Sequence, residues 1–179
     1  MKLRTILVAF RYLILVAVMV VLIGFLIPQR FVMPVQGASK ADYNPESFWF
    51  HPWGLSGTHK GVDIFAPANT DLKSSTSGLV VYTGTIGRGG NIVLVLGPKW
   101  RFHYYAHLNE INTKRFSWVR HGDLIGKVGD SGNATGKPPH LHYSIYTMLP
   151  YPWRMDDSPQ GWRKMFYLDP TPLLNAAAS

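Results

Sequence analysis

The 179-residue chain contains no cysteine, which excludes a disulfide framework and any thiolate metal site. A bound metal would therefore need histidine and carboxylate ligands. Acidic residues are also scarce, with 10 Asp and Glu against 18 Lys and Arg, and the formal net charge is +8. No basic run interleaved with aromatic residues accompanies this charge, so we expect no nucleic-acid binding.

Beyond the first 28 residues, the chain lacks any pattern that predicts a helix of three turns. Its 17 Gly, 13 Pro and 13% aromatic residues instead indicate short strands joined by turns. The candidate strands cover residues 78–84, 91–97, 101–107, 124–128 and 140–146. We predict an all-β fold, with a mostly antiparallel sheet that forms a groove or sandwich.

One hydrophobic run is present, and it lies at the N-terminus. Lys2, Arg4 and Arg11 precede an uncharged stretch that is strongly apolar over about 15 residues, from 13 to 27. This length fits a signal peptide or a short membrane anchor, because spanning helices usually need roughly 17–25 residues. Small residues suited to cleavage come only at 37–39. We therefore predict an uncleaved anchor, with the preceding basic residues in the cytoplasm.

The chain is predicted to divide into three parts. An N-terminal membrane anchor or signal segment covers residues 1–28, an irregular stalk covers 29–47, and a single β domain covers 48–179. Residues 148–167 combine prolines and aromatic residues without a period, which leaves two interpretations open. This segment either covers an edge of the sheet or forms one wall of a substrate groove.

Two short motifs carry potential ligands. His140 and His142 are two residues apart in a predicted strand, so their side chains share a face. His59 and Asp63 share a face of another extended segment, and Gly61 between them leaves space. Two histidines and an aspartate from two strands make a three-ligand set. Three protein ligands and an open position for water are typical of catalytic zinc, which generates hydroxide at neutral pH.

Four further histidines need an interpretation. His107 ends a predicted strand and is a candidate proton carrier. His103 has the same strand parity but lies roughly 13 Å away along the strand, so we predict a structural role. His51 and His121 occur beside Pro and Gly in turn-like contexts and are expected at the surface.

Four motifs, in this order, resemble the lysostaphin-type (LytM-like) zinc metallopeptidases. They are His59-x-Gly61-x-Asp63 followed by Ala66-Pro67, Tyr105-x-His107-Leu108, the glycine-rich stretch over residues 126–136, and His140-x-His142. The resemblance covers about residues 57–146 and is specific because all four motifs occur in sequence.

The resemblance implies a role for each histidine of these motifs. It implies that His59, Asp63 and His142 bind Zn2+, and that His107 and His140 are catalytic without being ligands. It also implies a β-sheet groove of the duplicated-hybrid-motif type and endopeptidase activity on the peptide part of peptidoglycan.

Two departures from the family pattern are present. Ala68-Asn69-Thr70 replaces the usual Gly before Thr, and Lys137-Pro138-Pro139 lengthens the approach to His140. Some members use a tyrosine to stabilise the oxyanion. Tyr143 is a poor candidate, because it faces the opposite side of the strand from its neighbour His142.

The leading interpretation is a membrane-anchored zinc endopeptidase that hydrolyses peptide bonds in peptidoglycan stem peptides or cross-links. The expected partners are peptidoglycan, the membrane through residues 1–28, and a regulatory protein. We expect the protein in the cell envelope, anchored in the inner membrane and facing the periplasm, or outside the cell if the N-terminal segment is cleaved. One alternative is a non-catalytic module that binds peptidoglycan or activates another hydrolase, although such members are expected to lack ligands. A phosphocarrier-like or lipoyl-like β domain is a third interpretation, but it would not require Asp63 beside His59.

Overall fold

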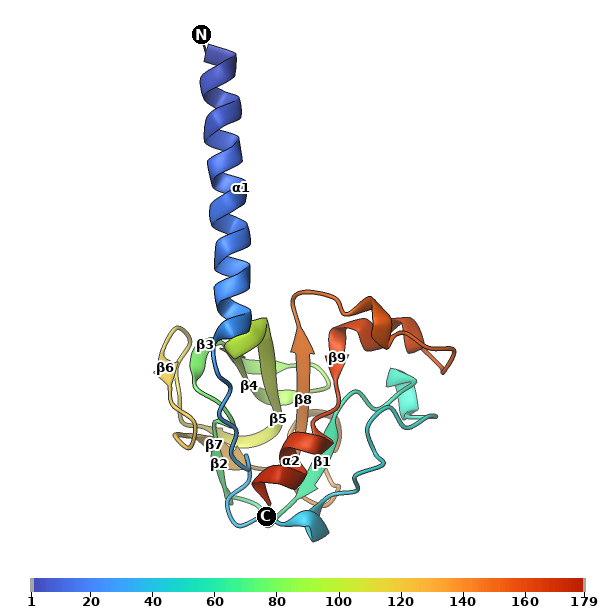
Figure 1. Cartoon of the computed structure of the whole chain (residues 1–179). Helices are drawn as coiled ribbons and strands as arrows, with labels where there is room; N and C mark the ends of the chain where they lie inside the picture. Colours follow the sequence, from blue (N-terminus) through green and yellow to red (C-terminus); the bar gives the residue numbers. More distant parts are fainter. Residues whose placement is uncertain (1, 179) are drawn as a thin grey trace.

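The N-terminal hydrophobic run forms a single exposed helix. The structure is a computed structural model that describes residues 2–178, with side chains from residue 4 onward. Helix α1, Lys2–Leu26, projects away from the rest of the chain (Figure 1). Its residues Arg4–Leu26 are long and apolar enough to cross a membrane, a property that signal sequences share. Met1, Ser179 and the side chain of Lys2, which the predictions include, lie outside the described part.

In the described residues, one nine-stranded, mostly antiparallel sheet organises the chain, which confirms the predicted fold class. The main strand order is β1-β8-β5-β4-β3-β6, while β7 pairs with β2 and β5, and β9 pairs with β8. The strands are β1 (Val62–Phe65), β2 (Asp71–Lys73), β3 (Gly78–Ile86), β4 (Gly90–Gly97), β5 (Arg101–Ile111), β6 (Trp118–Val119), β7 (Leu124–Val128), β8 (His140–Thr147) and β9 (Tyr167–Leu168).

Strand β5 is the centre of this sheet. It pairs with β4 and β8 over its first part and with β7 over its last part. Alternation of its side chains sends Tyr105 into the hydrophobic core, where Tyr143 and Ile145 of β8 and Val93 of β4 are also buried. The opposite face of the β5–β8 pair therefore remains available for polar groups.

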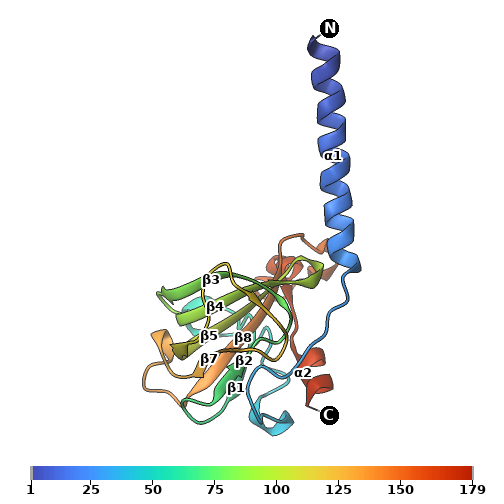
Figure 2. The same cartoon turned by 90° about the vertical axis from the view of Figure 1, so that its left-hand side faces the viewer.

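The segment predicted as a stalk lies against the β domain in this structure. Val35 is fully buried and forms a bridge with Leu72, and the Phe31 ring lies 6.1 Å from that of Tyr143. Figure 2 shows this segment and the C-terminal helix α2 (Thr171–Ala177) on one side of the sheet. The boundaries at residues 28 and 47 stay a prediction.

The remaining helical elements are short and connect the strands. These elements are the 3-10 helices η1 (Lys40–Asp42), η2 (Gly54–Ser56), η3 (Pro98–Trp100), η4 (Gly132–Ala134), η5 (Pro152–Arg154) and η6 (Gly161–Phe166). Helix η3 contacts α1, because the indole Nε1 of Trp100 donates a hydrogen bond to the Val21 carbonyl at 3.0 Å. No helix of three turns follows α1 within the described residues, as predicted.

Candidate metal centre

The pairing of β1 with β8 places two of the predicted ligands opposite each other. Asp63 is the register partner of His142 in this antiparallel pair, so their side chains share one face. His59 lies just before β1, in a segment held to the preceding chain by two backbone hydrogen bonds. Its amide donates to the Phe50 carbonyl at 3.0 Å, and its carbonyl accepts from the Trp49 amide at 2.6 Å.

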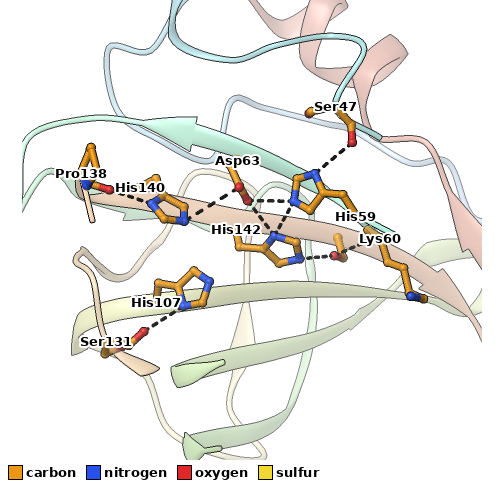
Figure 3. Close-up of polar contacts among 10 residues, drawn as sticks. Ser47, His59, Lys60, Asp63, His107, Ser131, Pro138, His140 and His142 are labelled. Atoms are coloured by element: carbon orange, nitrogen blue, oxygen red, sulfur yellow. Dashed lines mark hydrogen bonds and ion pairs between the residues drawn. The ribbon is translucent and has the colours of Figure 1, made fainter. Parts of the chain in front are cut away.

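The three predicted ligands converge on one point (Figure 3). Oδ1 of Asp63 lies 2.7 Å from Nδ1 of His142 and 3.1 Å from Nε2 of His59. The two imidazole nitrogens are 3.1 Å apart. One ligand atom from each residue lies within 4.8 Å of the others. The structure therefore brings together the three side chains that the sequence singled out.

Hydrogen bonds on the far side of each ring determine which nitrogen carries the proton. Nδ1 of His59 lies 3.0 Å from the Ser47 carbonyl, which can only accept, so Nδ1 donates. The Ser144 hydroxyl donates its proton to the Lys60 carbonyl at 2.7 Å, so it accepts from Nε2 of His142 at 3.0 Å. These contacts orient the rings as outer-shell partners orient metal ligands.

The consequence is a cluster of acceptors. With those tautomers, the lone pairs of His59 Nε2 and His142 Nδ1 point at the Asp63 carboxylate, and the three atoms have no proton to share. A cation resolves this arrangement, and two imidazole nitrogens with one carboxylate are a donor set of catalytic zinc.

Gly61 leaves the space that the sequence predicted. A Cβ atom at this position would lie 2.5 Å from both the Ser144 hydroxyl and the Tyr143 carbonyl, and 2.9 Å from the His142 ring. The backbone here packs directly against β8, so a side chain would displace a ligand or its support.

His107 reaches the same site because β5 is bulged. Between the pairs Val93↔Tyr105 and Asn91↔Leu108, two steps along β4 correspond to three along β5. The extra residue rotates the strand, and His107 adopts a φ of 68°. The Leu108 carbonyl after the bulge accepts hydrogen bonds from the Asn91 side chain at 3.1 Å and from a serine hydroxyl of the β7–β8 loop. This local irregularity directs the imidazole toward the three predicted metal ligands.

His107 and His140 are held in the same way as the predicted ligands. Nδ1 of His107 donates to the Ser131 carbonyl at 2.9 Å, and Nδ1 of His140 donates to the Pro138 carbonyl at 2.8 Å (Figure 3). Their ring centroids are 5.1 Å apart, and Nε2 of His140 is 4.0 Å from Asp63. Burial and the charge of the neighbouring histidines lower the pKa of His107 to about 4 despite its bond to Ser131. In the neutral form of each ring, Nε2 is therefore the nitrogen that carries the lone pair.

The sequence missed several parts of the site. Tyr104 shares the site face because it pairs with Ser144, and its ring lies 6.2 Å from that of His142. Burial raises the pKa of Tyr104 to about 12, so its hydroxyl remains a hydrogen-bond donor. Strand alternation from the buried Tyr105 could have identified it. Trp53, which stacks on His59 at 4.1 Å, carried no sequence signal.

The remaining histidines lie elsewhere. His103 is fully buried on the core face, which agrees with the predicted structural role, and His51 is exposed. His121 is half-buried and its Nδ1 lies 3.2 Å from the Ser77 hydroxyl, so the expectation of a surface position holds only in part.

A groove of about 760 Å³ surrounds the convergence point. The segment over residues 148–167 contributes to its wall, which supports the second interpretation of that segment. Trp49 Nε1 holds the segment by donating to the Pro159 carbonyl at 3.0 Å. Residues of the groove include the five predicted site residues together with Trp53, Lys60, Phe65, Arg88, Tyr104, Lys137, Gln160, Arg163 and Tyr167.

Comparison with known protein families agrees with this geometry. The model of peptidase family M23 matches residues 57–152, which is more than half of the chain and includes all five predicted site residues. The chain belongs to peptidase family M23. The resemblance predicted from the four motifs is thereby confirmed.

Curated M23 relatives share up to about two fifths of the aligned residues. An L-Ala–D-Glu endopeptidase of Bacillus subtilis is 37% identical over 116 residues, covering 60% of this chain and 36% of that protein. Lysostaphin of Staphylococcus simulans is 35% identical over 96 residues, covering 52% of this chain and 19% of that protein. The matched region thus covers 36% and 19% of the length of these two relatives.

Solved M23 structures confirm the fold. The catalytic domain of S. simulans lysostaphin superposes with a TM-score of 0.59 at 28% identity, covering 72% of this chain and 88% of that one. A protein from Ruminococcus gnavus, described as a putative glycyl-glycine endopeptidase, gives a TM-score of 0.64 at 26% identity, covering 83% of this chain and 61% of that one.

Proposed function

We propose that this M23 protein is a zinc-dependent endopeptidase that hydrolyses peptide bonds in peptidoglycan stem peptides or cross-links. The observation that carries the proposal is the convergence of three acceptor atoms, from His59, Asp63 and His142, beside two further histidines in one groove. The M23 relatives with peptidase names support it. Their names specify different bonds, so the bond that is cut depends on the groove of this chain.

Each side chain then has a distinct task. His59, Asp63 and His142 hold the zinc, which when bound supplies a Lewis acid for a carbonyl and lowers the pKa of a coordinated water. The neutral imidazole of His107 offers an Nε2 lone pair and accepts a proton at this position. His140, whose ring centroid lies 5.1 Å from that of His107, relays this same proton to the leaving amine. Tyr104 donates a hydrogen bond to the oxyanion that develops from the carbonyl.

The same proposal includes a place in the cell. Helix α1 anchors the chain in the membrane, with the basic residues Arg4 and Arg11 on the cytoplasmic side and the β domain in the periplasm. The groove then works on wall peptides close to the membrane. The proposal also includes a regulatory protein partner.

Digestion of purified peptidoglycan tests the function. The full-length protein is loaded with zinc in detergent, and the muropeptides released from defined cell walls are identified by mass spectrometry. We expect new peptide ends that disappear after chelation and return with zinc, and no release by His142→Ala. Zinc-independent release, or no release by the zinc-loaded protein, would contradict the proposal. In the second case the non-catalytic, hydrolase-activating module becomes the better account.

A further inference from the structure

The groove is unbalanced in charge. Four basic side chains contribute to its lining, and the single acidic one is Asp63, at the metal centre. The cations occur in two groups: Lys60 lies next to His59 in the chain and Arg163 comes from η6, whereas Arg88 and Lys137 come from the loops near His107 and His140.

A defined set of contacts holds Lys60 and the start of η6, the element that carries Arg163, to the same loop. Nζ of Lys60 donates to the Ser56 carbonyl at 3.0 Å and to the Thr58 carbonyl at 3.3 Å, which fixes the ammonium group. The side-chain Nε2 of Gln160 donates to the same Ser56 carbonyl at 3.1 Å, so the start of η6 is held against this loop. Arg163, three residues later, lines the same groove as Lys60.

No carboxylate neutralises this pair. Within residues 4–178, neither Lys60 nor Arg163 forms an ion pair, and nearby Lys164 is already paired with Asp156. Two like charges that line one groove repel each other, and an anion placed between them removes that repulsion. A guanidinium suits a carboxylate because it offers two parallel N–H groups, and Lys60 retains one N–H beyond its two carbonyl contacts.

We propose that Lys60 and Arg163 form a subsite for a free carboxylate of the substrate peptide. This inference rests on the proposed peptidase function and narrows its substrate class. In Figure 3, Lys60 lies beyond His59 at one end of the site and Pro138 lies at the other. The carboxylate therefore binds on the His59 side of the scissile bond. Stem peptides with acidic residues are preferred over oligoglycine, which has no side-chain carboxylate.

The test uses matched peptides and the full-length, zinc-loaded protein. The parent is a synthetic stem peptide with all of its free carboxylates. In each of the other peptides, one of these carboxylates is replaced by a carboxamide. Charge-assisted hydrogen bonds contribute about 1.5–3 kcal/mol, which corresponds to roughly 10–100-fold. We expect one carboxamide peptide to lose about 10–100-fold in kcat/KM, mainly through KM.

Variants then assign this preference to the subsite. Lys60→Met with Arg163→Gln should abolish the preference and leave hydrolysis of the disfavoured carboxamide peptide within about threefold. Arg88→Gln with Lys137→Met removes the same charge at the other end and should retain the preference. Lys114→Met with Arg120→Gln removes two positive charges outside the groove and controls for the change in net charge. Thermal unfolding of each variant verifies that it folds.

The outcomes separate this inference from the proposed function. Hydrolysis without preference for any carboxylate, or a preference that survives Lys60→Met with Arg163→Gln, overturns the subsite and leaves the peptidase intact. A preference lost only in the Arg88 and Lys137 variant also overturns it. If no peptide is cut, equilibrium binding of the same peptides decides: selective binding that needs Lys60 and Arg163 supports the subsite, and equal binding refutes it.

Discussion

His103 and His107 lie four residues apart on β5, yet they occupy opposite environments. His103 is fully buried on the core face, where its Nδ1 lies 2.6 Å from the Tyr143 hydroxyl. His107 borders the groove and is held by a backbone carbonyl. In a regular strand the two would share a face. The bulge between them reverses the parity and thus separates a structural histidine from one beside the candidate metal centre.

The comparison extends to the two faces of the β5–β8 pair. On the core face, aromatic rings and His103 satisfy one another, and burial with the nearby charge of Arg101 lowers the pKa of His103 to about 3. On the groove face, each of the four histidines has one ring nitrogen hydrogen-bonded to another part of the chain, and its second nitrogen faces the site. On the core face, the His103 ring and the hydroxyls of Tyr105 and Tyr143 find hydrogen-bond partners within the chain, whereas the lone pairs of the groove require a ligand.

The largest expected effect separates the two histidines by function. His107→Ala should lower kcat on peptidoglycan by about 10²–10⁴, as expected for the loss of a positioned proton carrier, and should keep zinc at one ion per chain. His103→Gln should retain kcat within about threefold. Zinc content and muropeptide release are measured on both. Full activity of His107→Ala would remove this residue from the mechanism.

A smaller effect is expected where the chain supports a ligand. Ser144→Ala removes the acceptor for Nε2–H of His142, so the ring loses its fixed orientation. Loss of such an outer-shell partner typically costs 10–100-fold in metal affinity. Competition with a zinc chelator of known affinity measures it, and Ser77→Ala, remote from the centre, is the control. Unchanged affinity would show that the serine does not orient His142.

The third expectation concerns acid stability on the core face. Unfolded His103 has a pKa near 6.5, and in the folded chain it falls to about 3, so below pH 6.5 the unfolded state binds more protons. Protonation of the unfolded state therefore lowers the free energy of unfolding by about 2 kcal/mol between pH 7 and 5. Urea unfolding should show this extra loss in the wild type relative to His103→Gln. Parallel pH profiles for the two proteins would contradict it.

Much of the fold follows from local pattern. The predicted strands at residues 78–84, 91–97, 101–107, 124–128 and 140–146 are all present, because each alternates or concentrates β-branched and aromatic residues. Strands β2, β6 and β9 have two or three residues and are too short to produce such a signal. Their existence depends on neighbouring strands that only the folded chain provides.

The site shows the same division between pattern and tertiary context. The spacing of His59 with Asp63 and of His140 with His142 indicated that each pair shares a face of its strand. Gly61 indicated free space between His59 and Asp63. The spacing could not indicate the bulge before Leu108, since a bulge depends on cross-strand hydrogen bonds with Asn91. Backbone carbonyl partners likewise carry no side-chain signature.

Location of the bound zinc tests the central claim most directly. Crystals of the zinc-loaded protein, measured at the zinc absorption edge, should give one strong anomalous peak within about 2.0–2.2 Å of His59 Nε2, Asp63 Oδ1 and His142 Nδ1. The remaining coordination position should hold solvent. A peak elsewhere, a site lacking one of these three ligands, or a fourth protein ligand would contradict the account.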